Sequence, residues 1–187
     1  LVSGGGSKTT PAPTAKDVSR AEEDPYVRPL LKDWGVPAAA LLLSGEMHGY
    51  MEPCGCSLTQ SGGLERRGHL QRQLTEKGWT VAGLDVGGTL KRSRMQDRLK
   101  FEAILSGLKQ LGYSAVAAGD SELRISPDLL ISLFAEEEGI QLGGMLTACN
   151  VVLFGSPELG VPKPWSIVQV GDVKVGVGAV LGQSGAQ

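Results

Sequence analysis

The side chains best suited to metal or redox chemistry are concentrated in one short stretch of the chain, residues 44–67. It reads SGEMHGYMEPCGCSLTQSGGLERR and follows the apolar run AAALLL at residues 38–43. The chain of 187 residues holds only two histidines and three cysteines, yet His48, Cys54 and Cys56 lie within nine residues of one another. Carboxylates and imidazoles are ligands for hard and borderline divalent metal ions, whereas thiolates are ligands for soft ones. The stretch therefore offers two candidate sites, one at Glu46 and His48 and one at the cysteines.

The segments that must position these residues alternate between apolar runs typical of strands and amphipathic runs typical of helices. This order indicates a mainly parallel sheet with helices packed on it. A final pair of alternating runs, joined at Gly171 and Asp172, predicts a β-hairpin. The predicted fold class is therefore α/β, a layered sandwich on a mainly parallel sheet. The predicted strands are residues 38–45, 80–88 and 114–120 and a fourth beginning near residue 140, and the predicted helical segments are residues 62–79, 95–113 and 126–139.

Acidic residues and a histidine stand at the ends of three predicted strands. Right-handed crossovers place the carboxyl ends of neighbouring parallel strands side by side, and ligands collect at that edge. Two divalent metal ions held there by several strands can activate water and hold a phosphate. The candidate metal ligands are Glu46, His48, Asp85 and Asp120, and Glu122 is a candidate substrate-binding residue.

The acidic residues also have a structural interpretation. Carboxylates at strand ends often cap the next helix or hydrogen-bond a turn, and this applies to Asp85, Asp120 and Glu122. His48 directly follows a buried strand, a setting that favours a functional role. The other histidine, His69, lies inside the first predicted helix and is interpreted as a surface or packing residue.

Cys54 and Cys56 form a CxC motif around Gly55. They are too close in sequence for an ordinary disulfide and could form only a strained one. One interpretation is a tight loop whose small side chains pack under the site, and the other is a redox-sensitive thiol or soft-metal site. A single CxC supplies two of the four thiolates of a closed zinc site. Cys149 is predicted to lie on a strand in the core.

The turn at Gly62 and Gly63 begins the first predicted helix and is a candidate border of the substrate site. Glycine lets the backbone approach a ligand closely, and a helix N-terminus favours negative charge. Arg66 and Arg67 follow, either to meet an anion or to lie on a solvated face. Two adjacent helical residues cannot both face one site.

The charge and composition argue against a protein that binds nucleic acid and against a segment that spans a membrane. The net charge of −2 gives no electrostatic footprint for nucleic acid, and no apolar run is long enough to cross a bilayer. Residues 1–24 are rich in Gly, Ser, Thr, Pro and Ala and predict a disordered leader or linker. Such a segment is typical of the sequence after a cleaved export signal, and equally of an artificial linker. Residues 25–187 are predicted to form one domain.

Four motifs together resemble those of one enzyme family. They are GEMHGYMEPCGC, QSGGLERR, LDVGG and LGYSAVAAGDSEL. The set is similar to the amino-terminal half of metallophosphoesterases of the 5′-nucleotidase type, and above all to a bacterial subgroup with E-P-C-G-C followed by G-G-L-x-R-R. The resemblance is strongest over residues 38–123 and extends more loosely to residue 182. It implies a domain that is incomplete at the carboxyl end of this chain.

The resemblance implies roles for residues at the first two strands. Where the family has D-x-H-G, Glu46 replaces the metal-binding Asp and His48 keeps the metal-binding His. Gly88 stands where the family has the bridging Asp of its G-D motif. A glycine has no side chain with which to bridge metal ions.

At the third strand, where the family has N-H-E, this chain has Asp120, Ser121 and Glu122. Asp120 thus replaces the metal-binding Asn, Ser121 replaces the catalytic His, and Glu122 is retained. A hydroxyl cannot protonate a leaving group at neutral pH as an imidazole can. These departures imply a remodelled or degenerate metal centre on the shared fold.

Two functions follow from the resemblance. The first is metal-dependent hydrolysis of a small phosphoester, with manganese, zinc or iron as the divalent metal. The second is a non-catalytic binding or docking module. Since the similar proteins are exported and some are joined to c-type cytochrome regions, the resemblance also implies a periplasmic or cell-envelope location and a c-type cytochrome region or partner.

Overall fold

The fold is described from a computed structural model of the chain. The chain divides into two units, Leu1–Gly35 and Val36–Gln187, and every element below belongs to the second. The predicted leader at residues 1–24 lies outside the described residues. The structure describes residues 31, 33–53, 62–92, 94–135 and 142–182.

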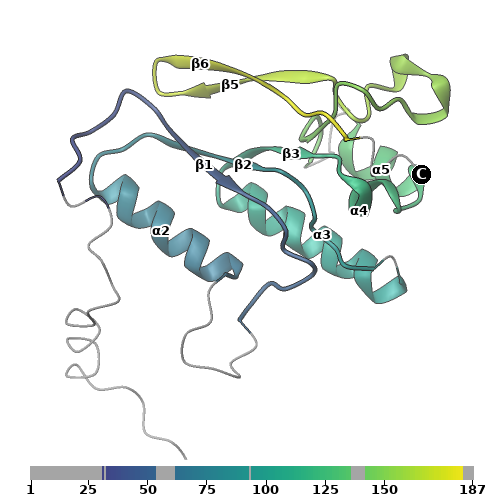
Figure 1. Cartoon of the computed structure of the whole chain (residues 1–187), viewed down its shortest axis with the longest axis horizontal. Coiled ribbons are helices and arrows are strands. Elements are labelled where there is room, and N and C mark those ends of the chain that lie inside the picture. The colour runs from purple at the N-terminus through teal and green to yellow at the C-terminus, as the bar shows by residue number, and fades with distance from the viewer. Residues whose placement is uncertain (1–30, 32, 54–61, 93, 136–141, 183–187) are drawn as a thin grey trace, which may run out of the picture. The chain divides into compact units, whose positions relative to one another are not determined.

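A parallel sheet of four strands, in the order β1-β2-β3-β4, forms the centre of the described unit (Figure 1). The predicted α/β class with a mainly parallel sheet is confirmed. Ser44 pairs with Asp85, and Asp85 pairs with Val116, so the first three strands bring their carboxyl ends to one edge. The strands are β1 (Ala40–Ser44), β2 (Val81–Asp85), β3 (Tyr113–Ala117) and β4 (Leu146–Thr147).

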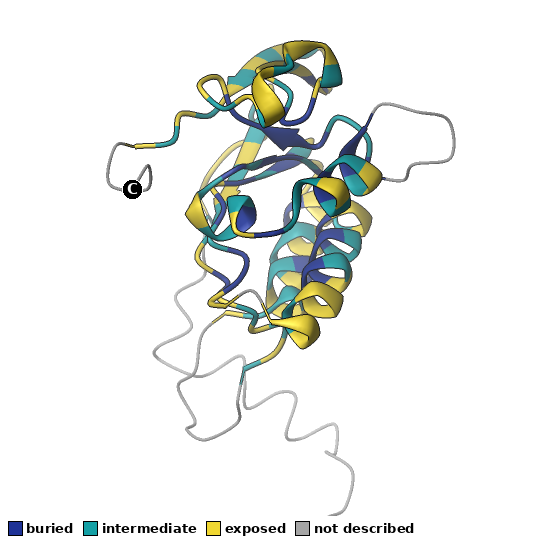
Figure 2. Cartoon of the chain, turned by 90° about the vertical axis from the view of Figure 1, so that its right-hand side faces the viewer, coloured by how far each residue is buried: buried dark blue, intermediate teal, exposed yellow. Residues whose placement is uncertain are grey.

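Two long helices, α2 (Leu64–Glu76) and α3 (Met95–Gln110), lie on one face of the sheet (Figure 1). Apolar residues at helical spacing form the buried face of α3, and four of them are fully buried, whereas Leu99, in the same spacing, is 69% exposed. Figure 2 shows this buried layer between the helices and the sheet. Two shorter helices, α4 (Asp120–Leu123) and α5 (Pro127–Phe134), follow β3. The buried residues of α3 are Phe101, Ile104, Leu105 and Leu108.

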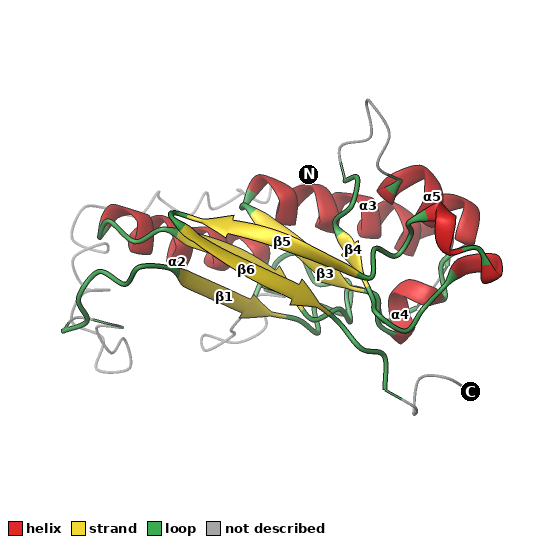
Figure 3. Cartoon of the chain, turned by 90° about the horizontal axis from the view of Figure 1, so that it is seen from above, coloured by secondary structure: helices red, strands yellow, loops and turns green. Residues whose placement is uncertain are grey.

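The predicted hairpin is present and covers the other face of β2. Its strands β5 (Trp165–Val170) and β6 (Val173–Gly178) pair antiparallel and turn at residues 171–172, as predicted. Val168 and Val170 pack against Ala82 of β2. Figure 3 shows the hairpin lying over the sheet. A hairpin, rather than a helix, therefore forms the third layer at this point. Two 3₁₀ turns, η1 (Leu153–Gly155) and η2 (Pro157–Leu159), connect β4 to it.

Gly83 in β2 makes room for a tyrosine that links the strands. A Cβ atom at this position would overlap the Tyr113 ring, which is 1% exposed. The Tyr113 hydroxyl lies 3.0 Å from that of Ser44 at the end of β1. The small residue in β2 thus lets β3 contact the end of β1 across the intervening strand.

Element ends differ from the sequence prediction by a few residues. The second strand, predicted to reach residue 88, ends at Asp85, because Gly87 and Gly88 take positive φ angles and turn the chain away. The fourth strand is only two residues long. Within the described ranges, no helix has the length and apolar character that a membrane span requires.

Candidate functional site

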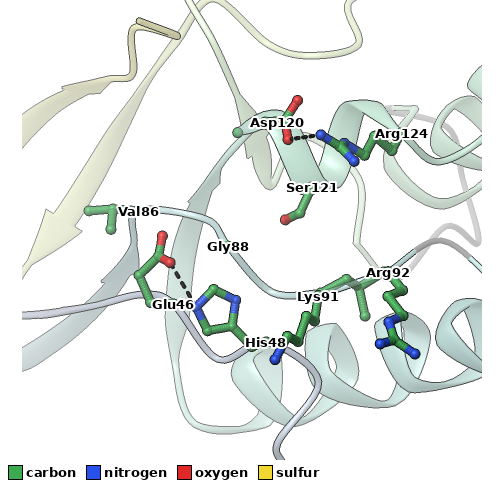
Figure 4. Close-up of a pocket in the computed structure, with 11 residues that line it drawn as sticks. Glu46, His48, Val86, Gly88, Lys91, Arg92, Asp120, Ser121 and Arg124 are labelled. Atoms are coloured by element: carbon green, nitrogen blue, oxygen red, sulfur yellow. Dashed lines mark ion pairs between the residues drawn. The ribbon is translucent and has the colours of Figure 1, made fainter. Parts of the chain in front are cut away.

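A cavity of about 340 Å³ opens at the carboxyl edge of the sheet (Figure 4). Its walls come from the loop after β1, the loop after β2 and helix α4, so three consecutive strand ends contribute. Figure 4 shows Glu46 and His48 on one side, Asp120 and Ser121 on the other, and Gly88 between them. The cavity is lined by Glu46, His48, Val86, Gly88, Leu90, Lys91, Arg92, Gly119, Asp120, Ser121 and Arg124.

Glu46 and His48 form a pair at one wall of this cavity. The Glu46 Oε2 atom lies 3.0 Å from His48 Nε2, and the two side chains are 70% and 45% exposed. Both residues have left-handed backbone conformations, with φ of 54° and 49°. Such conformations are costly for residues other than glycine and persist only where surrounding contacts impose them.

Those contacts come from the loop after β2. The backbone N–H groups of Glu46 and His48 donate to the carbonyls of Gly87 and Gly88 at 2.8 and 2.9 Å. The N–H of Gly49 donates to the carbonyl of Thr89 at 2.7 Å. The two loops therefore run side by side beyond the ends of their strands and form the cavity floor together.

Asp120, the third predicted metal ligand at the cavity, pairs with an arginine. Its Oδ2 atom lies 2.7 Å from Nη2 of Arg124, one helical turn later. Both side chains are at least half exposed, so the pair stabilises the helix only weakly. The carboxylate is shared with a cation that also lines the cavity.

Asp85 does not belong to the residues that line the cavity. Its side chain is fully buried, and Oδ2 accepts from Arg67 Nη1 at 3.0 Å and from the Ser44 hydroxyl at 2.7 Å. Its Oδ1 atom accepts from the N–H of Gly87 at 3.0 Å. The structure thus places this predicted ligand in a hydrogen-bonded network with an arginine.

Glu122 is fully buried and also lies outside the cavity lining. Its Oε1 atom accepts from the backbone N–H and hydroxyl of Thr89 and from the Ser121 hydroxyl. Its Oε2 atom accepts from the N–H groups of Gly119 and Gly88 at 3.0 and 3.4 Å. The carboxylate joins the loop after β2 to the start of α4, two of the segments that line the cavity.

Gly62, Gly63 and Arg66 do not line the cavity. Gly62 and Gly63 have φ angles of 98° and 90° at the start of α2, with Gly63 against the carbonyl of Met51. Arg66 is exposed on α2. Cys54 and Cys56 lie outside the described residues, and Cys149 is exposed rather than part of the core.

Lys91 and Arg92 line the cavity and were missed by the sequence analysis. Both are exposed, and in the described part of the chain neither has a carboxylate partner. They follow β2 in the segment GGTLKR. Their position just beyond the end of a strand is the feature of the sequence that could have identified them as cavity residues. With Arg124 they place three cationic side chains around the cavity.

The described residues do not fit a two-metal centre. Glu46 and His48 provide one adjacent pair of metal-ligand types, while Asp85 is enclosed by its own partners and Asp120 is paired with Arg124. Across the described ranges, no group of three His, Cys, Asp or Glu side chains is placed to hold a metal ion. Gly88, at the centre of the cavity floor, offers no side chain.

Comparison with solved structures shows the same fold in a known enzyme. The chain is similar to the 5′-nucleotidase precursor from Thermus thermophilus, with a TM-score of 0.63 and 22% sequence identity. The match covers 79% of this chain and 29% of that protein, so the chain spans less than a third of its length. No family model and no curated protein matches the sequence. The shared feature is the α/β architecture with its parallel sheet.

Proposed function

We propose that this chain binds a small phosphate ester in the cavity at the carboxyl edge of its sheet, as a 5′-nucleotidase-like domain with a remodelled centre. The observation that carries the proposal is the placement of Lys91 and Arg92, two cations without a described carboxylate partner, at this edge. Ligands of open α/β sheets bind at the carboxyl ends of the strands. The volume of about 340 Å³ suits a small molecule.

Three cationic and two acidic side chains line the cavity, so the lining carries a net positive charge that favours a phosphate group. Arginine and lysine are the usual side chains that bind phosphate oxygens, the former through its planar fork and the latter as a point charge. Ser121 adds a hydroxyl and His48 an imidazole at the same cavity. In this proposal, cationic side chains supply the positive charge that divalent metal ions supply in a two-metal hydrolase.

Calorimetric titration with AMP as the phosphate ester and adenosine as its uncharged counterpart tests this proposal. The chain is expected to bind AMP and to bind adenosine at least about tenfold more weakly. The double variant Lys91→Ala/Arg92→Ala is expected to lose this preference, whereas Lys174→Ala, an exposed lysine of β6, is expected to keep it. Equal affinities of the unaltered chain for AMP and adenosine, or no binding of either, would overturn the proposal.

Metal-dependent hydrolysis of a phosphoester is the second candidate. The distance of 3.0 Å between Glu46 Oε2 and His48 Nε2 favours it, because both groups are ligands of manganese, zinc and iron. Titration with Mn²⁺ or Zn²⁺, followed by assay with p-nitrophenyl phosphate, distinguishes the candidates. Metal binding and turnover that both disappear in His48→Ala would support hydrolysis; AMP binding without turnover would support the binding module.

An exported location and a c-type cytochrome partner are further parts of the proposal. They rest on the EPCGC and GGLERR motifs and on the composition of residues 1–24. Fractionation of the source cells tests the location, and co-purification of a protein with a haem Soret band tests the partner. Recovery of the protein from the cytoplasmic fraction alone would refute the first.

A further inference from the structure

We propose that Arg67 is a positioning residue for the cavity and holds its floor in place through the buried carboxylate of Asp85. This inference rests on the proposed function in one respect only, because one of its two tests measures the binding of AMP. Arg67 comes from α2, whereas the cavity is built from the loops after β1 and β2 and from α4. The proposed role is therefore to connect a helix outside the cavity to the two loops that carry Glu46, His48 and Gly88.

The contacts of Arg67 converge on the ends of β1 and β2. Its Nη1 atom lies 3.0 Å from Asp85 Oδ2 and donates to the Ser44 hydroxyl at 2.8 Å. Its Nη2 atom lies 3.5 Å from the carbonyl of Gly45. The Ser44 hydroxyl in turn contacts Tyr113 of β3 at 3.0 Å. One guanidinium thus contacts both strand ends and, through Ser44, the third strand.

Burial makes the loss of this contact costly. The side chain of Asp85 is 0% exposed and that of Arg67 is 16% exposed. A carboxylate in such a place is stable only when a cation and hydrogen-bond donors compensate for its lost hydration. Arg67 is the cation that does so, and its planar fork can satisfy two acceptors at once.

The cavity floor begins one residue beyond these contacts. Gly45 precedes Glu46, and Asp85 accepts from the N–H of Gly87, which precedes Gly88. From there the two loops are joined by the backbone hydrogen bonds from Glu46 and His48. Both residues hold left-handed conformations that relax if those bonds loosen. Loss of Arg67 should therefore release the Glu46–His48 pair.

Arg66 provides a matched control because it neighbours Arg67, is exposed and makes no ion pair with the described carboxylates of these loops. Arg67→Ala is expected to weaken AMP binding at least about tenfold, whereas Arg66→Ala is expected to leave it unchanged. Millimolar guanidinium, which carries the same charge and hydrogen-bond donors as the missing group, is expected to restore binding to Arg67→Ala. It should have no such effect on the unaltered chain. A residue needed only for folding would not show this chemical rescue.

A second measurement does not depend on AMP. The chain has two histidines, so the imidazole proton resonance of His48 is identified by its disappearance in His48→Gln. Arg67→Ala is expected to shift this resonance and guanidinium to restore it, with Arg66→Ala as the unchanged control. If the unaltered chain does not bind AMP but the resonance behaves in this way, the proposed function fails and the role of Arg67 stands.

The proposal is overturned if folded Arg67→Ala keeps both the AMP affinity and the His48 resonance of the unaltered chain. Should Arg67→Ala not fold, Arg67→Lys retains the charge but loses the fork. It is expected to be folded and to show an intermediate shift of the His48 resonance. An unshifted resonance in Arg67→Lys, with unchanged AMP affinity, would equally refute the role.

Discussion

The carboxylate of Glu46 lies where a side chain at position 88 would lie. A Cβ atom built on Gly88 would stand 2.5 Å from Oε1 of Glu46 and 2.8 Å from its carboxyl carbon. The two positions are brought together by the loops after β1 and β2. The Glu46 side chain therefore fills the space that is free because Gly88 has no side chain.

Gly88→Ala is expected to destabilise the fold and to displace Glu46 from His48. The substitution forces a residue with a Cβ atom to adopt a φ of 71°, which costs about 1–2 kcal/mol, and it adds the overlap with Glu46. Urea denaturation measures the loss of stability. Gly160→Ala is the matched control, because Gly160 has a φ of 61° but open space around its Cβ position. Because the Glu46 side chain is exposed and can move aside, an unshifted His48 imidazole resonance in folded Gly88→Ala is the outcome that would contradict the steric relationship.

The paired substitution Glu46→Asp/Gly88→Asp is expected to create a divalent metal site. The shorter side chain at position 46 leaves room for a carboxylate at position 88, where aspartate tolerates the left-handed conformation better than most residues. The two carboxylates then join His48 as a three-ligand group suited to Mn²⁺ or Zn²⁺. Calorimetry with Mn²⁺ should give an affinity at least about tenfold above that of the unaltered chain.

The single variants test whether the two positions act together. Gly88→Asp alone keeps the overlap with Glu46, and Glu46→Asp alone adds no ligand, so each is expected to bind Mn²⁺ less well than the pair. If either single variant binds as tightly as the double variant, the interdependence of positions 46 and 88 is refuted.

The sequence was sufficient to predict the arrangement of strands and the edge where the cavity lies. Alternating apolar and amphipathic runs set the order of elements, and parallel pairing then brings the ends of β1, β2 and β3 together. The hairpin could also be predicted, because its turn at residues 171–172 separates two runs of alternating residues. These features depend on local periodicity, which a single sequence displays.

The contacts of the acidic residues could not be predicted from the sequence in the same way. Both aspartates lie near the carboxyl ends of strands, Asp85 as the last residue of β2 and Asp120 at the start of α4 shortly after β3. Yet one is enclosed by Arg67 and the other lies at the cavity beside Arg124. Arg66 and Arg67 are adjacent in sequence, and only the orientation of α2 on the sheet decides which of them reaches the carboxylate. Such choices arise from tertiary packing, which has no periodic signature.

Glu122→Gln is expected to be far more destabilising than Asp120→Asn. The Glu122 carboxylate is fully buried and accepts from five donors, so an amide nitrogen in place of one oxygen would face N–H groups that it cannot satisfy. The expected cost is about 2–4 kcal/mol. Asp120 and Arg124 are half exposed or more, and losing that pair costs less than about 1 kcal/mol. Comparable urea midpoints for the two variants would contradict the supporting role of Glu122.

Arg67→Ala and Asp85→Ala are expected to lower stability by less together than the sum of their separate effects. Either single change leaves a buried charge without its partner, which costs about 3–5 kcal/mol, whereas the double variant leaves none. A thermodynamic cycle from urea denaturation of the three variants should therefore give a coupling free energy above about 1 kcal/mol. The pair Arg66→Ala and Asp85→Ala is the control and is expected to be additive, because Arg66 is exposed and forms no ion pair with Asp85. Additive effects for Arg67 and Asp85 would show that the ion pair does not hold the two strand ends together.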